Sequence, residues 1–175
     1  MNLRVIGYML MLVASGLMTG CTGIPEGIKP VQQFELQRYL GKWYEAARLD
    51  HSFERGLNRV SAEYSLREDG GVKVVNRGWD AEKKQWKEAV GKAYFVRNSD
   101  EGYLKVSFFG PFYGAYVIFA LDADYQYSFI SGPDREYLWL LSRTPTVPAS
   151  VMQKFKQQAA SLGFDVGKLI VVSQQ

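Results

Sequence analysis

The chain has 175 residues, of which 47% are apolar and 22% charged, so its composition is that of a globular protein of about one domain. There are 21 basic and 18 acidic side chains, and this charge of +3 is too weak and too evenly scattered for a nucleic-acid-binding face. One cysteine and one histidine exclude an intrachain disulfide, a cysteine-rich zinc site and most histidine-based catalytic designs. We therefore expect no metal and no cofactor.

Residues 1–20 have the pattern of a secretory signal. The apolar stretch Val5–Met18 is too short to span a bilayer core of ~30 Å comfortably, and small residues follow it. The run Leu17–Cys21 resembles the bacterial lipobox, in which the cysteine is lipid-modified and becomes the new N-terminus. The resemblance implies that Cys21 anchors the chain. Thr22 in place of Asp implies the outer membrane, with the domain facing the periplasm. The alternative is an ordinary signal peptide with an incidental cysteine.

We expect three parts along the chain. They are a lipoprotein signal peptide over 1–20, a lipidated N-terminus and tether over 21–32, and one folded domain over 33–175. The tether contains Pro25 and Pro30 together with two glycines, a composition that is typical of a linker.

Turn residues recur about every ten positions after Trp43, and the segments between them are rich in Tyr, Phe, Val and Trp. Several segments alternate apolar and polar residues, as strands with one buried face do. The short connections favour antiparallel neighbours in an all-β, eight-stranded up-and-down β-barrel, because a sandwich needs longer crossings. The eight strands are expected over 42–49, 58–67, 71–79, 85–96, 103–109, 113–121, 125–131 and 136–143.

One C-terminal α-helix follows the strands. Pro148 suits its first turn, and Val151, Phe155 and Ala159 recur at helical spacing before Gly163. A short final strand is expected over Leu169–Val172.

Three blocks of sequence then point to a family. Gly41–Glu45 contains the Gly-x-Trp that opens the first lipocalin strand. Phe119–Tyr125 resembles the second lipocalin motif, and Leu141–Arg143 resembles the third. Together with the lipobox, the chain resembles the bacterial outer-membrane lipocalins, relatives of apolipoprotein D, over about Gln33 to Ser173.

The resemblance assigns structural roles to five motif residues. It implies that the Arg143 guanidinium lies over the Trp43 ring at the closed end of the barrel, where both form a plug. Gly41 allows close backbone approach at the start of the strand. Asp122 and Tyr125 belong to the second motif.

The family resemblance also implies a cavity whose mouth lies opposite the plug, under the loop Asp50–Leu57. We expect aromatic side chains to form its wall, and Arg55, Arg59 or Lys105 to meet an anionic head group there. Tyr113 and Tyr116 have opposite parity, so a regular strand cannot turn both inward. The candidate wall residues are Phe53, Phe109, Tyr113, Tyr116 and Trp139.

No catalytic residues are predicted. His51 has no nucleophilic partner that the sequence identifies, a lone histidine in a polar loop is usually exposed, and the lipobox uses the only thiol. The resemblance implies an anchored protein that binds, stores or transports a fatty acid or lysophospholipid in the envelope under membrane stress, and it leaves a homodimer open. The alternatives are a structural lipoprotein with a packed barrel and an enzyme acting on a lipid.

Overall fold

The computed structural model describes residues 22–175. The predicted signal peptide and the predicted anchor Cys21 lie outside the described residues. No helix within 22–175 is long and apolar enough to cross a membrane.

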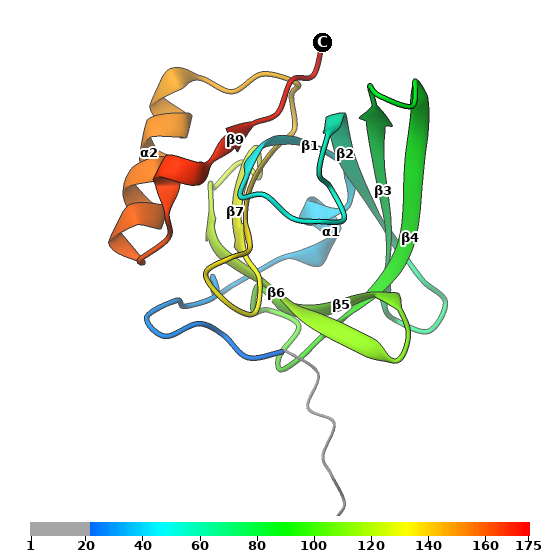
Figure 1. The fold of residues 1–175 in the computed structure, drawn as a ribbon. Helices are drawn as coiled ribbons and strands as arrows, with labels where there is room; N and C mark the ends of the chain where they lie inside the picture. Colours follow the sequence, from blue (N-terminus) through cyan, green and yellow to red (C-terminus); the bar gives the residue numbers. More distant parts are fainter. Residues whose placement is uncertain (1–21) are drawn as a thin grey trace, which may run out of the picture.

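Eight antiparallel strands close into a barrel, as the spacing of the turns predicts (Figure 1). Each strand pairs with the next in the chain, and β1 closes the barrel by pairing with both β8 and β2. No strand crosses between two sheets, so the sandwich alternative does not apply. The strands are β1 (Gly41–Arg48), β2 (Leu57–Leu66), β3 (Val72–Asp80), β4 (Gln85–Phe95), β5 (Tyr103–Phe109), β6 (Phe112–Leu121), β7 (Tyr127–Ser131) and β8 (Leu138–Ser142).

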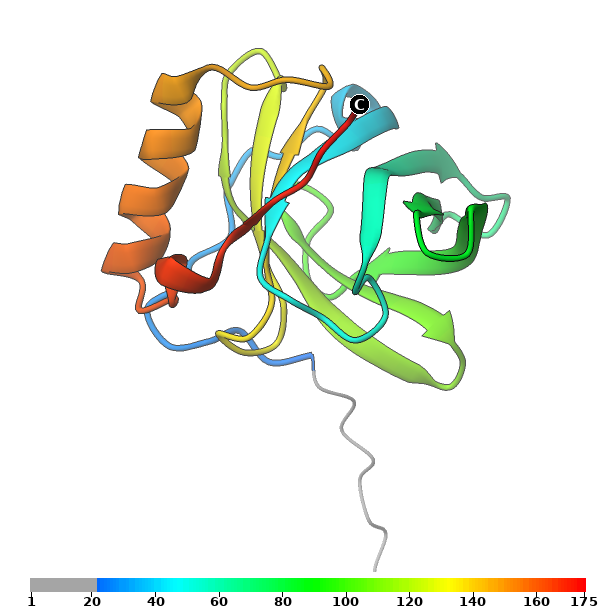
Figure 2. The ribbon, with the colours of Figure 1, turned by 45° about the horizontal axis from the view of Figure 1, so that its top comes forward.

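The predicted C-terminal helix is α2 (Ala149–Ser161), which lies along the outside of the barrel (Figure 2). Its Phe155 and Ala159 are fully buried, and the Phe155 ring lies 5.0 Å from that of Phe129 on β7. A short 3₁₀ helix, η1 (Val166–Lys168), then leads to the expected final strand, β9 (Ile170–Val171). This strand pairs with Ala47 and Arg48 at the end of β1. The fold thus has an apolar layer between α2 and the barrel as well as the barrel interior.

The segment before the barrel is more ordered than the tether that its prolines suggest. Ile28 is buried in the layer beneath α2. The Val31 amide donates to the Ile118 carbonyl at 2.9 Å, and the Gly102 amide donates to the Val31 carbonyl at 2.8 Å. A short helix that the sequence does not predict, α1 (Leu36–Tyr39), follows and leads into β1. It is too short to show helical periodicity.

Trp43 and Arg143 close one end of the barrel. The Trp43 ring is fully buried, and its indole N–H donates to the Tyr39 carbonyl at 2.8 Å. The Arg143 guanidinium carbon lies 4.0 Å from the centre of the Trp43 ring. The same guanidinium donates to the carbonyls of Lys42 at 2.9 Å and Arg38 at 2.7 Å. It therefore joins α1 and the start of β1 to the end of β8.

The backbone beside this stack adopts a conformation that favours glycine at position 41. Its φ is +90°, a value that residues with a Cβ rarely adopt, and a Cβ there would lie 3.5 Å from the Arg143 guanidinium. A larger side chain would strain the backbone where the arginine approaches it.

Asp122 and Tyr125 shape the turn between β6 and β7. The Asp122 carboxylate accepts the backbone N–H groups of Gln126 at 2.7 Å and Tyr127 at 2.5 Å. The Tyr125 hydroxyl accepts the Glu35 amide at 2.9 Å. The second motif thus attaches this turn to the segment that enters α1.

We predict that Arg143→Ala lowers the free energy of unfolding by about 2–3 kcal/mol, because it removes hydrogen bonds from a charged donor and uncovers Trp43. Urea unfolding followed by tryptophan fluorescence measures the loss. Arg67→Ala is the matched control, since it breaks an exposed ion pair with Asp69 and should cost about 1 kcal/mol or less. Equal losses in the two variants would contradict the role given to Arg143.

Candidate ligand-binding cavity

The barrel encloses a cavity of about 750 Å³. Its wall is mostly apolar and comes from all eight strands, α1 and the β1–β2 loop. The exposed large apolar members of the wall are Phe53 on the β1–β2 loop and Phe109 and Phe112 at the β5–β6 turn, all at the end opposite Trp43. The cavity therefore opens at this end, and the volume lies in the range of roughly 300–1,000 Å³ of small-molecule sites.

All five predicted wall residues lie around this cavity. Tyr116 and Trp139 contribute inside the barrel, whereas Phe53 and Phe109 lie at the mouth, with 58% and 80% of their surfaces exposed. Tyr113 is at the rim, where its ring packs 6.4 Å from Tyr94 and 5.1 Å from the Lys105 ammonium. The parity of β6 thus directs the Tyr116 side chain into the barrel and the Tyr113 ring towards outward-facing neighbours.

Three tyrosine hydroxyls meet on the cavity wall near the plug. The Tyr116 hydroxyl lies 2.8 Å from those of Tyr39 and Tyr64, and the Tyr39 hydroxyl lies 3.0 Å from that of Ser128. Burial raises the pKa of Tyr39 to about 12, and it also raises the pKa of Tyr64 and of Tyr116. The group is therefore neutral at physiological pH and adds hydroxyls, without charge, to an apolar wall.

Two buried carboxyls, Glu45 and Glu54, face the cavity beneath the β1–β2 loop. The Arg48 guanidinium donates to Glu45 at 2.6 Å and to the backbone carbonyls of Glu54 at 2.8 Å and Leu57 at 3.3 Å. The Trp139 indole N–H donates to the Glu54 carboxyl at 3.0 Å. Burial is the main cause that raises the pKa of both carboxyls, and the charge of Glu54 raises that of Glu45 further. This network holds both ends of the loop against β1 and β8.

His51 is buried, which differs from the exposed loop position expected of it. Its ring lies 5.2 Å from Phe53, 4.9 Å from Tyr137 and 4.7 Å from Trp139. Its Nε2 atom has no hydrogen-bond partner within residues 22–175. Burial and the Arg48 charge lower the pKa of His51 to about 4, so the ring is neutral near pH 7. The histidine acts as an aromatic packing residue at the mouth.

The cations at the cavity are Lys87 and Arg77, and the sequence argument missed both. The Lys87 ammonium pairs with the Asp80 carboxylate at 2.8 Å, and the Arg77 guanidinium pairs with Glu88 at 3.2 Å. Both lie on the β3–β4 hairpin, which reaches the mouth. The register places Lys87 opposite Gly78 on the inward face, whereas Arg77 and Glu88 pair on the outward face of the hairpin.

The cations expected at the head group lie elsewhere. Arg55 pairs with Asp50 at 2.6 Å, Arg59 lies 4.7 Å from the Trp79 ring, and Lys105 lies beside Tyr113. None of the three lines the cavity. Strand parity decides this for Lys105, which alternates with the inward residues of β5.

Sequence parity could have found part of the buried network. Glu45 lies two residues after Trp43 on β1, so it shares the inward face with the plug. A carboxyl at such a position is a sign of a polar group in the interior. Glu54 and Tyr39 gave no such signal, because they lie on a loop and on a one-turn helix.

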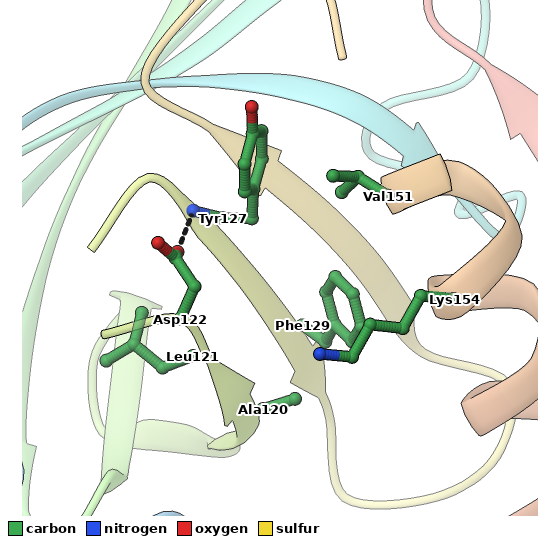
Figure 3. A pocket seen from close by; sticks show the side chains of 7 residues that line it. All are labelled: Ala120, Leu121, Asp122, Tyr127, Phe129, Val151 and Lys154. Carbon is green, nitrogen blue, oxygen red and sulfur yellow. Dashed lines mark hydrogen bonds between the residues drawn. The ribbon is translucent and has the colours of Figure 1, made fainter. Parts of the chain in front are cut away.

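A second, smaller pocket of about 170 Å³ lies outside the barrel, between the β6–β7 region and α2 (Figure 3). Asp122 lines it, but its carboxylate accepts the Tyr127 amide. Lys154 of α2 is the other charged residue there. This pocket is below the usual size of a ligand site. Within residues 22–175 no three His, Cys, Asp or Glu side chains gather as a metal site would need.

We predict that His51 makes stability depend on pH. Its pKa is about 6.5 in an unfolded chain and about 4 in the fold, so the unfolded state takes up the proton first as the pH falls. From pH 7 to pH 5 the protein should lose about 2 kcal/mol more than His51→Phe, which keeps a ring but cannot be charged. Urea unfolding at both pH values measures this, and Glu45 and Glu54 contribute equally to both proteins. Parallel losses in the two proteins would contradict the burial of a neutral histidine.

Comparisons with known proteins agree with the fold. The model of the lipocalin-like domain family matches residues 34–174. A protein called outer membrane lipoprotein Blc from Vibrio cholerae is 61% identical over 166 residues, which cover 94% of this chain and 97% of the relative. The Blc of Escherichia coli K12 is 47% identical over 174 residues, 98% of both chains.

The structure is also similar to that of insecticyanin from the tobacco hornworm Manduca sexta. The TM-score is 0.68 at 19% identity, covering 86% of each chain, which shows a common fold. The resemblance inferred from the three sequence motifs is thus confirmed. The chain belongs to the lipocalin family.

Proposed function

We propose that the protein binds one single-chain lipid, a fatty acid or a lysophospholipid, with the acyl chain inside the barrel. The observation that carries the proposal is the open, largely apolar cavity of about 750 Å³. Each buried CH₂ group contributes about 0.8 kcal/mol, less the cost of ordering the chain. Burial of an alkyl chain is therefore enough for binding without any catalytic residue.

The head group would lie at the mouth, beside inward-facing Lys87 and within reach of Arg77 on the outer face of the same hairpin. Fatty acids and lysophospholipids both carry an anionic group at one end of an alkyl chain, which suits these two cations. Both cations already have acidic partners, Asp80 and Glu88, so an anion would compete with these carboxylates. The buried pair Glu45 and Glu54 disfavours a deeper position for an anionic head group.

The relatives are named outer membrane lipoproteins, which supports the same location here. The proposal includes cleavage of residues 1–20, lipid attachment at Cys21 and a domain over 33–175 that faces the periplasm. The lipid would be stored or carried within the envelope. Two further alternatives have less support. The open cavity argues against a structural lipoprotein with a packed barrel. The buried carboxyls Glu45 and Glu54 hold the β1–β2 loop through Arg48 and Trp139, which argues against an enzyme that acts on a lipid.

We predict that Gly114→Leu weakens lipid binding by about tenfold or more. A Cβ at Gly114 meets no atom within 4 Å, and the residue lies on the wall two positions from inward-facing Tyr116. Leucine would thus displace two or three CH₂ groups of the ligand without disturbing the fold. The change in tryptophan fluorescence on titration with palmitate or lysophosphatidylethanolamine, below their micelle concentrations, gives both affinities, because Trp139 lines the cavity.

Ala123→Leu is the matched control, because it adds the same side chain to an exposed turn at the closed end. It should bind both lipids like the parent protein. Unchanged binding by Gly114→Leu would place the ligand outside the barrel. A parent protein that binds neither lipid would refute the proposed function.

A further inference from the structure

Two phenylalanines at the tip of the β5–β6 hairpin are the most exposed large apolar side chains within residues 22–175. Phe109 is 80% exposed and Phe112 is 69% exposed. Only Gly110 and Pro111 lie between them, so the tip is a continuous apolar point. Isolated exposed apolar residues are ordinary, but two adjacent aromatic rings on a projecting turn suggest a contact surface.

The sequence around the tip has no charge. From Val106 to Leu121 the chain contains no acidic or basic residue. A segment of this kind can approach lipid tails without a penalty for removing a charged side chain from water.

Basic side chains lie next to the tip, around Tyr113 on the outer face of the barrel. Tyr113 follows Phe112, and the ammonium groups of Lys105 and Lys92 lie 5.1 Å and 6.0 Å from its ring. A tyrosine between an apolar point and a pair of lysines matches the layers of a bilayer surface, where aromatic rings lie at the head groups and cations meet anionic lipids.

The start of the described chain lies on the same side of the molecule. In both views the first described segment, coloured blue, and the β5–β6 hairpin lie at the lower side (Figures 1 and 2). The Tyr103 hydroxyl, on β5, donates to the Thr22 carbonyl. The position next to Cys21 is therefore attached to the strand that leads to the tip.

We propose that the β5–β6 tip, with Phe109 and Phe112, enters the surface of the lipid bilayer that carries the N-terminal anchor. This inference rests on the proposed attachment of lipid at Cys21. Both phenylalanines also line the mouth of the cavity, so the docked barrel would open beside the bilayer. A single-chain lipid could then enter the barrel without its alkyl chain crossing water.

The test uses the full lipidated chain in vesicles of phosphatidylethanolamine and phosphatidylglycerol, with bromine on the acyl chains of part of the lipid. Phe109→Trp adds one emitter at the tip. Leu66→Trp is the matched control, because Leu66 is 52% exposed at the opposite end of the barrel. Emission is corrected for the parent protein. We expect the added emission of Phe109→Trp to fall about twofold or more and that of Leu66→Trp to stay unchanged.

Phe53→Trp separates the bilayer from lipid held in the cavity. Phe53 lies at the mouth on a different loop, so a brominated lipid inside the barrel would quench it as strongly as the tip. Equal quenching of Phe53→Trp and Phe109→Trp, or none at Phe109→Trp, would overturn the proposal. Quenching of Phe109→Trp only where the protein sediments as a dimer would instead assign the tip to a second copy, which also overturns it.

The same variants distinguish this proposal from the proposed function. Binding of palmitate without vesicles reports the cavity alone. If Phe109→Trp is quenched in vesicles but the protein binds no palmitate, the docking proposal is supported and the proposed lipid binding is refuted. If the protein binds palmitate but Phe109→Trp is not quenched, only the docking proposal is refuted.

Discussion

The stack of Arg143 on Trp43 determines how the rest of the barrel is organised. Its guanidinium carbon lies 4.0 Å from the ring centre, and its N–H groups donate to backbone carbonyls on α1 and at the start of β1. The two ends of the barrel sequence thus meet over one fully buried indole. Because this large ring fills the narrow end, the residues above it can leave the interior open. The three tyrosine hydroxyls lie next to the plug and are satisfied by each other and by Ser128, so no charge is needed there.

The opposite end follows a different physical rule. The buried Arg48 guanidinium holds the β1–β2 loop, because it donates to the Glu45 carboxyl and to the backbone carbonyls of Glu54 and Leu57. Burial raises the pKa of the Glu45 and Glu54 carboxyls beside it. A buried guanidinium is costly to desolvate. Its two terminal nitrogens have partners in Glu45, Glu54 and Leu57, whereas its Nε atom has none within residues 22–175. These directional hydrogen bonds fix one conformation of the β1–β2 loop, whereas an apolar loop without them could adopt several conformations. His51 adds a neutral ring to this packing. The mouth is therefore held by polar and ring contacts on the β1–β2 side, and it is apolar and exposed at the β5–β6 tip.

The period-two patterns and turn residues predicted the eight strands, their antiparallel order and α2, because these signals are local. Tyr116 and Trp139 could be placed near the cavity for the same reason. Features that depend on contacts between distant segments could not be predicted. Lys105 seemed a suitable cation, but its strand parity turns it to Tyr113, whereas Lys87 reaches the mouth from β4. His51 lies in a polar loop, and only the meeting of that loop with Tyr137 and Trp139 buries it. The helix α1 and the docking of Val31 also arise from long-range contacts.

The central claim is that the open barrel holds one single-chain lipid. Native mass spectrometry with lipid extraction, on the lipidated protein purified from its own envelope, tests it most directly. A Cys21→Ser form purified in parallel separates lipid attached at Cys21 from lipid held in the cavity, and the masses also report how many copies associate. The account predicts one fatty acid or lysophospholipid per chain, released on denaturation in both forms. A protein that carries no such lipid, and takes up none when it is added, would contradict it.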